Sequence, residues 1–247
     1  MGCATGDRTA VTCEKTQILI RRENCAIQVG PVIAYKLGRV KKQLLLNFEM
    51  EMVAMKPLEG IRVLEMGTHF AAPMCGRILA DWGAEVIKVE APEGDPYRVS
   101  FRNQRTPQFE DGCPSFDLEN ANKQFLSVNA KDTAGQEVIY KLAATCDVFL
   151  TNNRLNAMKK LRLTYEEIKA VNPKIVYADM TGYGSKGPLK DKPGYDYTCF
   201  LSRSGMMADL SPKGESVMST IGGFGDHVAA PTLAAGVSAG PVKGQTT

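Results

Sequence analysis

The feature that most constrains the fold is a repeated alternation of short apolar runs with helix-like segments, which begins after Met55. Ile61–Met66 is typical of a buried strand, Ala71–Trp82 has helical spacing, and Glu85–Val89 is the next apolar run. Strand, helix and strand within about 30 residues form one βαβ unit, whose two strands run parallel. Because the alternation continues, the sequence predicts an α/β fold: a doubly wound (Rossmann-like) parallel sheet with flanking helices.

Further apolar runs extend this pattern along the chain. The additional predicted strands are Phe125–Ala130, Asp147–Thr151 and Lys174–Met180. Two of the intervening helices start with a capping-box pattern, Thr133 with Gln136 and Thr164 with Glu167. Residues 91–121 are rich in Pro, Gly, Asp and Asn, and they predict a long loop. A loop of that length in a compact domain is usually functional.

Residues 1–54 differ from the rest of the chain. Residues 35–54 could form a short amphipathic helix, but no βα alternation is visible here. This segment holds 8 basic and 5 acidic residues, whereas the remainder holds 22 of each. We interpret 1–54 as an atypical N-terminal extension, either a targeting or regulatory arm or a disordered segment upstream of a mis-assigned start. The second interpretation, with Met55 as the natural start, is favoured, and the main domain is expected to cover 55–247.

Composition excludes several classes of function. An electrically neutral body does not provide the concentrated basic face that nucleic acid requires. No apolar run reaches the roughly 18 residues that a membrane span needs. The chain has seven cysteines without CxxC spacing and only two histidines, so neither a zinc site nor a disulfide framework is predicted. These features indicate a cytoplasmic protein without nucleic-acid, membrane or metal partners.

Two turns carry candidate functional residues. The turn Gly67–Pro73 follows the first strand of the sheet, at the end where open α/β sheets bind ligands. It lacks GxGxxG, so it does not support a dinucleotide site. His69 in this turn could lie beside an anion or cap a neighbour. Asp226 is flanked by Gly225 at the start of an Ala-rich helix that reaches about Ala239. Its carboxylate could act as a nucleophile, although a carboxylate at such a position is by itself more often a helix N-cap.

Four ordered blocks of sequence resemble one enzyme family. They are KPLEGIRVLEMGTHFAAPMCGRILADWGAEVIKVEAPEGDP, FDLENANKQFLSVNAKDTAGQ, NPKIVYADMTGYGSKGPLKDKPGYDY and GFGDHVAAPTLAAG. Together they resemble the class III (CaiB/BaiF-type) coenzyme A transferases, which include formyl-CoA and carnitine CoA transferases. Within that family, TNNRLNAMKKL and PGYDYTCF are most similar to clostridial transferases that act on 2-hydroxy acids such as phenyllactate or 2-hydroxyisocaproate.

The resemblance implies a role for particular residues. Asp226 would be the nucleophile that carries CoA through a covalent aspartyl intermediate, with Gly225 leaving room for the substrate. Tyr195 would lie in the substrate pocket. The positions that match CoA contacts of the family are His69, Phe70, Ala71, Lys131, Lys160 and Leu161. At position 160 a lysine stands where the family has arginine, which keeps the charge but loses planar stacking. Coenzyme A is then a substrate, and no tightly bound cofactor or metal is expected.

Two alternatives stay open beside the transferase. The first is a 2-methylacyl-CoA racemase of the same family, which would have a histidine where this chain has Tyr195. The second is an inactive, truncated CoA-binding fragment. Family members have about 400 residues and form interlocked homodimers, as the resemblance implies. Residues 238–247 depart from the family pattern, so we expect the C-terminal part of the fold to be missing and the chain as given to be poorly soluble or inactive.

Overall fold

The structure is a computed structural model that describes residues 17–23, 26–32, 56–218 except 101–112, and 220–245. The chain divides into two compact units, Met1–Met55 and Lys56–Thr247. The first unit contains an antiparallel strand pair that the sequence pattern had not predicted, formed by β1 (Gln17–Glu23) and β2 (Ala26–Val32). The helix expected over residues 35–54 lies outside the described residues.

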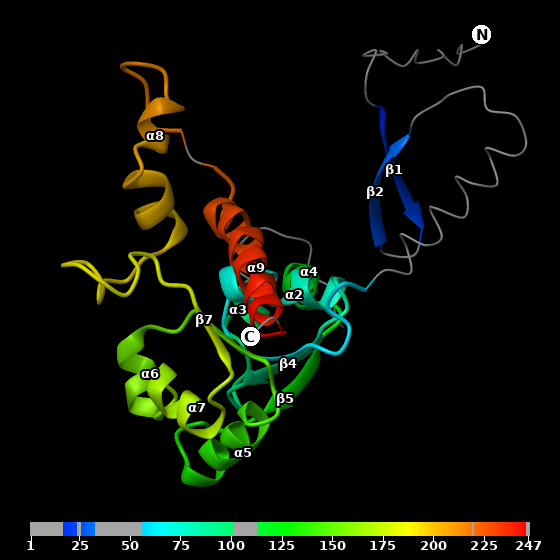
Figure 1. Cartoon of the computed structure of the whole chain (residues 1–247). Coiled ribbons are helices and arrows are strands. Elements are labelled where there is room, and N and C mark those ends of the chain that lie inside the picture. Colours follow the sequence, from blue (N-terminus) through cyan, green and yellow to red (C-terminus); the bar gives the residue numbers. More distant parts are fainter. Residues whose placement is uncertain (1–16, 24–25, 33–55, 101–112, 219, 246–247) are drawn as a thin grey trace, which may run out of the picture. The chain divides into compact units, whose positions relative to one another are not determined.

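The second unit is built on a parallel sheet of five strands, in the order β5-β4-β3-β6-β7 (Figure 1). The strands are β3 (Arg62–Met66), β4 (Glu85–Glu90), β5 (Gln124–Ser127), β6 (Val148–Thr151) and β7 (Val176–Asp179). The strand that comes first in this unit, β3, lies in the middle of the sheet, so the chain proceeds outward first to one edge and then to the other. This order confirms the predicted doubly wound α/β fold and puts the switch point between β3 and β6.

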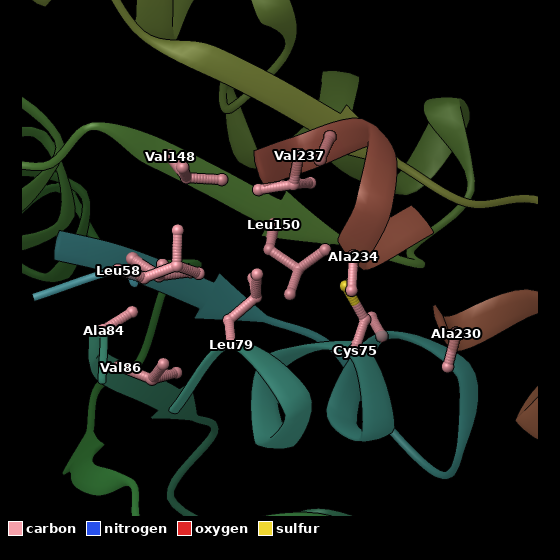
Figure 2. Close-up of a cluster of buried hydrophobic side chains, with 13 residues drawn as sticks. Leu58, Cys75, Leu79, Ala84, Val86, Val148, Leu150, Ala230, Ala234 and Val237 are labelled. Atoms are coloured by element: carbon pink, nitrogen blue, oxygen red, sulfur yellow. The ribbon is translucent and has the colours of Figure 1, made fainter. Parts of the chain in front are cut away.

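Helices cover both faces of this sheet. On one face α2 (Ala71–Asp81) packs against α9 (Phe224–Gln245), and both contact the strands. Figure 2 shows how Ala230 and Ala234 of α9 lie close to Cys75 of α2, with Leu150 of the sheet nearby. The other face buries side chains of α5 (Thr133–Ala143), α6 (Leu155–Leu161) and α7 (Tyr165–Val171).

One of the two predicted capping boxes is confirmed. The Glu167 carboxylate accepts hydrogen bonds from the backbone N–H (2.8 Å) and the hydroxyl (2.7 Å) of Thr164 at the start of α7. The other is wrong, because Thr133 is itself the first helical residue of α5. The Gln136 side chain instead donates to the carbonyl of Ala130 (3.1 Å) and ties the helix to the loop before it.

The prediction that residues 91–121 form one long loop is also wrong. Two short helices lie within it, α3 (Tyr97–Ser100) and α4 (Pro114–Asn120). A proline at the first helical position of α4 is the sequence signal that could have revealed that helix. The rings of Tyr97 and Phe116 are both buried and form a small apolar cluster with Cys113.

The segment between β7 and α9 brings further side chains to the sheet's ligand end. It contains η2, a π-helix over Asp196–Ser202, and α8 (Met206–Asp209). The π-helix packs against both α8 and α9, and π-helical turns are frequent at functional sites. No helix in the part of the chain that the structure describes is long and apolar enough to cross a membrane.

A group of charged side chains is buried inside this apolar framework. Lys88 of β4 pairs with Glu65 of β3 (3.0 Å) and with Asp95 (3.1 Å), and it donates to the carbonyl of Gly67 (2.8 Å). Lys123 pairs with the second oxygen of Glu65 (2.8 Å). All four charged side chains are fully buried. Burial alone would lower the pKa of Lys88, but the two carboxylates raise it, so the ammonium stays charged.

These four residues form what we call the buried charge network, which connects several loops at the ligand end of the sheet. Asp95 accepts hydrogen bonds from the backbone N–H groups of His69 (3.2 Å) and Tyr97 (2.9 Å). Lys123 donates to the carbonyl of Pro73 in α2 (2.7 Å) and to the Asn120 side chain of α4 (2.9 Å). The network therefore fixes the turn after β3 relative to β4, α2 and α4.

We predict that Lys88→Met strongly destabilises the second unit. The substitution leaves Glu65 and Asp95 buried without a shared cation, which costs about 3 to 5 kcal/mol in the free energy of unfolding. Urea denaturation followed by circular dichroism measures this loss. Lys141→Met, at an exposed lysine of α5, is the matched control and should change stability by less than about 0.5 kcal/mol. Equal effects of the two substitutions would contradict the role of the network.

Candidate functional site

Two loops meet at the switch point of the sheet, where β3 and β6 end. The Asn152 side chain accepts a hydrogen bond from the backbone N–H of Thr68 (2.9 Å) and donates to the carbonyl of the same residue (2.8 Å). The Asn153 side chain donates to the carbonyl of Met66 (2.7 Å). The two asparagines therefore hold the turn after β3 in a fixed conformation, and a ligand at the switch point would meet a preformed surface.

His69 and Phe70, both predicted to contact CoA, lie in this turn. His69 has a backbone φ of +63°, a left-handed conformation that is unfavourable for a residue with a side chain. Its hydrogen bond to Asp95 stabilises that conformation. The Phe70 ring packs against Tyr97, with 4.4 Å between centroids, and edge-on against His227 at 5.8 Å. Phe70 thereby joins the turn after β3 to the first turn of α9.

Asp226 lies within the first turn of α9, because the helix begins two residues earlier, at Phe224. The N-cap interpretation of this aspartate is therefore wrong. Gly223, just before the helix, has φ +81°, and a side chain there would approach the Phe70 ring to 3.1 Å. A Cβ at Gly225 would overlap the Phe200 ring and the Asp196 carboxylate. Glycine is thus required at both positions for the turn to lie against its neighbours.

Asp196 is a site residue that the sequence analysis missed. Its side chain accepts a hydrogen bond from the backbone N–H of Gly225 (2.8 Å) through Oδ1, and the residue is only 8% exposed. Its Oδ2 is buried and has no hydrogen-bond partner among the described residues. The available signal was its place in the motif Pro193-Gly-Tyr-Asp, directly after Tyr195. Asp196 holds the turn that carries Asp226.

The Asp226 carboxylate is half-buried, and its charged neighbours are the Asp196 carboxylate and the imidazoles of His227 and His69. Burial raises its pKa above the ordinary value, and the nearby charge of Asp196 raises it further. His227 and His69 act in the opposite direction and lower the pKa, but they do not cancel the increase. A carboxylate with a raised pKa and few water contacts is more basic and more nucleophilic than one in bulk solvent.

The other predicted site residues divide into two groups. Ala71 is buried at the start of α2, and Tyr195, 71% exposed, immediately precedes Asp196. Lys131 is exposed on the loop between β5 and α5, while Lys160 and Leu161 end helix α6. Within the residues that can be described, no hydrogen bond or ion pair joins these last three side chains to the Asp226 turn. The structure therefore brings together His69, Phe70, Ala71, Gly225 and Asp226, with Tyr195 adjacent through Asp196.

A cavity of about 510 Å³ lies elsewhere, beside α6, α7 and β7. Met158, Tyr165 and Tyr177 are among its lining side chains, and none of the predicted site residues is. Across the described part of the chain, no group of three or more His, Cys, Asp and Glu side chains is arranged to hold a metal ion. The Asp226 turn, where side chains from the turn after β3, from η2 and from α9 meet, is therefore taken as the candidate site.

Known proteins resemble this chain over most of the second unit. The model of CoA-transferase family III matches residues 58–247. The (R)-2-hydroxy-4-methylpentanoate CoA-transferase of Clostridioides difficile is 46% identical over 179 residues, which is 72% of this chain and 45% of the relative. The cinnamoyl-CoA:phenyllactate CoA-transferase of Clostridium sporogenes is 43% identical over 188 residues, which is 76% of this chain and 46% of the relative.

A solved structure agrees with these sequence relatives. A CaiB/BaiF family protein from Brucella suis superimposes with a TM-score of 0.69 at 31% identity, covering 76% of this chain and 49% of that protein. The predicted family resemblance, including the likeness to clostridial 2-hydroxyacyl-CoA transferases, is confirmed. The chain spans about half the length of the curated relatives that it matches.

We predict that Gly225→Ala disrupts the turn that carries Asp226. The new methyl group overlaps Phe200 and Asp196, and relieving such an overlap costs about 1 to 3 kcal/mol. Gly236→Ala is the matched control, because that position on α9 has no atom within 4 Å of an added Cβ. An interior helical alanine there should stabilise the protein by up to about 1 kcal/mol. Urea unfolding distinguishes the two, and a Gly225→Ala variant as stable as wild type would contradict the packing described.

Proposed function

Because the chain belongs to CoA-transferase family III, we propose that it transfers coenzyme A from an acyl-CoA thioester to a carboxylic acid, with Asp226 as the nucleophile. The observation that carries this proposal is the environment of Asp226. Its carboxylate is half-buried in the first turn of a long helix, next to Gly225, and burial together with the charge of Asp196 raises its pKa. These conditions favour nucleophilic attack by a carboxylate.

The proposed reaction proceeds through alternating anhydrides and thioesters. The Asp226 carboxylate attacks the thioester carbonyl, forming a mixed anhydride as the bond to CoA breaks and the thiolate leaves. The thiolate then attacks the aspartyl carbonyl, which releases the donor acid and leaves CoA on Asp226 as a thioester. The acceptor carboxylate then attacks the aspartyl thioester, which forms a second anhydride and releases the thiolate. The thiolate attacks the acceptor's carbonyl, which forms the product thioester and frees Asp226. Over the whole cycle one thioester and one carboxylate are consumed and one of each is formed, so no oxidant, reductant or external energy source is needed.

The first turn of α9 can stabilise the charge that develops in each step. Each attack creates a tetrahedral oxyanion next to the aspartyl or acyl carbon. Backbone N–H groups in the first turn of a helix lack intrahelical partners, and the helix dipole adds positive potential at the same end. The Gly225 N–H is already bonded to Asp196, so the donors would be other N–H groups of that turn. Such preorganised donors are the usual source of oxyanion stabilisation in acyl transfer. Glycine at position 225 removes the side chain that would block the approach of the substrate.

We assign the binding of coenzyme A to the loops at the ligand end of the sheet. His69, Phe70 and Ala71 would contact the molecule near its reactive end, because the Phe70 ring reaches the first turn of α9. Lys131 and Lys160 would meet phosphate groups at the other end of CoA, where exposed lysines provide positive charge. Leu161 would lie beside the adenine. CoA enters and leaves as a substrate and is not a resident cofactor.

A 2-hydroxy acid is the proposed acceptor, and a homodimer is the proposed assembly of the complete enzyme. The acceptor follows from the names of the two clostridial relatives, which act on 2-hydroxy-4-methylpentanoate and phenyllactate. Tyr195, exposed beside Asp196, is the side chain that we expect to contact the acid. The remaining wall of the acyl pocket would come from the part of the relatives that this chain does not match.

The racemase alternative fits the site less well. It requires a second acid/base group opposite Asp226, on the other side of the substrate's α-carbon. Tyr195 occupies the position where a racemase would have histidine. His227 follows Asp226 on the same helix, and both of its ring nitrogens already contact protein oxygens, at Gly223 and Glu119. It is therefore not available to exchange a proton with the substrate.

We predict that Asp226 can be trapped as a CoA thioester. Incubation with cinnamoyl-CoA followed by hydroxylamine should convert Asp226 to a hydroxamate, which peptide mass spectrometry locates. Asp226→Asn should reduce this labelling by at least about a hundredfold. Asp209→Asn, at an exposed carboxylate of α8, is the matched control and should label like wild type. Labelling at another residue, or equal labelling of Asp226→Asn, would refute the nucleophile assignment.

We also predict that Asp196→Asn extends labelling to lower pH. Only the ionised form of Asp226 attacks, so labelling is lost as the pH falls through its raised pKa. Asparagine keeps the acceptor for the Gly225 N–H but removes the negative charge, which lowers the pKa of Asp226. The midpoint of a plot of labelling rate against pH should therefore move to lower pH. A midpoint that stays in place or moves upward would show that Asp196 does not tune the nucleophile.

A further inference from the structure

His227, the residue after the proposed nucleophile, has both ring nitrogens engaged by protein oxygens. Nδ1 lies 2.6 Å from the carbonyl oxygen of Gly223, and Nε2 lies 2.8 Å from Oε1 of Glu119 on α4. A carbonyl oxygen only accepts hydrogen bonds, so Nδ1 must carry a hydrogen. When Glu119 is ionised, its carboxylate likewise only accepts, and Nε2 opposite it then carries a second hydrogen. The geometry is that of an imidazolium held between two acceptors.

Glu119 is placed where it needs a cation. The residue is 1% exposed, and its second oxygen, Oε2, is buried without a hydrogen-bond partner among the described residues. Burial raises the pKa of Glu119, while the charges of His227, Lys123 and Arg77 oppose that increase. Lys123 is bonded to Glu65 in the buried charge network. The only cation that Glu119 contacts directly in the described structure is therefore His227.

We propose that His227 and Glu119 form a positioning pair for the aspartate nucleophile. Glu119 keeps the His227 ring doubly protonated, and the ring fixes the first turn of α9 against α4 with a positive charge beside Asp226. This proposal rests on the proposed function of Asp226. In this proposal neither residue reacts with the substrate, and both act through the position and ionisation of Asp226.

The pair balances the other charges that face Asp226. Asp196 and the Cys199 thiol approach from η2, His69 approaches from the turn before α2, and His227 lies on α9 itself. The negative charge of Asp196 favours protonation of Asp226, which would remove the nucleophile. The imidazolium of His227 favours the carboxylate. Opposed neighbours of this kind keep a half-buried carboxylate ionised while leaving it poorly solvated.

The pair also gives the fold a pH dependence of defined sign. Burial by itself would lower the pKa of His227, but its bond to Gly223 and the charge of Glu119 raise it above 6.5. The folded state then holds this proton more tightly than the unfolded chain does. The stabilisation is complete below pH 6.5, the value for unperturbed histidine, and is lost as the pH rises through the higher folded value.

The proton on His227 can be measured without any substrate. The whole chain contains only two histidines, so ¹³C-labelled imidazole signals in an NMR titration are assigned with the single variant His227→Gln. We expect the His227 pKa of the wild-type chain to lie above 6.5 and to fall in Glu119→Gln. Asp117→Asn, at an exposed carboxylate of the same helix, should leave it unchanged. A His227 pKa at or below 6.5 in the wild type, or equal His227 pKa values in wild type and Glu119→Gln, would overturn the proposed ion pair.

Trapping of the Asp226 thioester then tests whether the His227–Glu119 pair affects the ionisation of Asp226. Glu119→Gln weakens the positive charge beside Asp226, so the midpoint of labelling against pH should move upward, opposite to the shift expected for Asp196→Asn. A His227 pKa that responds to Glu119→Gln, with no change in the labelling midpoint, would overturn the positioning role. Absence of labelling at Asp226 in the wild-type chain would instead refute the proposed function, while the NMR result would still decide whether the ion pair exists. If Glu119→Gln fails to fold, the wild-type titration alone decides the protonation of His227.

Discussion

The arrangement of the site depends on the buried charge network. Two lysines and two carboxylates, on strands β3 and β4 and in the adjoining loops, are removed from water, a cost that only mutual pairing offsets. In return, Lys88 and Asp95 fix the direction of the loop after β4, and Asp95 holds the backbone of His69 in its left-handed conformation. Lys123 extends the same connection to α2 and α4. Hydrophobic packing alone, which has no directional preference, would not fix the conformations of these loops.

The site itself combines elements that are remote in the sequence. The turn after β3 supplies His69 and Phe70, η2 supplies Asp196, and α9 supplies Asp226. Helix α9 reaches this place because its alanines allow close packing on α2 and the sheet. Three connections hold its first turn: the Phe70 ring, the Asp196 carboxylate and, in our proposal, the ion pair of His227. The ionisation of Asp226 is thereby coupled to the tertiary contacts that position it.

The half of the relatives that this chain matches contains the proposed chemistry. Both the sheet's ligand end and the proposed aspartate nucleophile lie within residues 58–247, the range of the family match. Selection between acceptor acids depends on the side chains that line the acyl pocket, not on the reacting carboxylate. This separation of reacting group and pocket wall is consistent with relatives of one family that are named for different acids.

The sequence by itself determined the class of fold and the strands of the second unit, because alternating apolar runs are local properties of the chain. It singled out Asp226 only through the resemblance to the transferase family, since a glycine-flanked carboxylate at a helix start is by itself also typical of an N-cap. It did not reveal α4, whose seven residues lie in a segment with loop-like composition, nor the strand pair of the first unit. The charge of Lys88 gave no indication that its side chain is buried. The contacts of Asp196 and Glu119 were likewise decided only by tertiary structure, since a carboxylate loses water and gains a partner only when folding brings distant residues within hydrogen-bond distance.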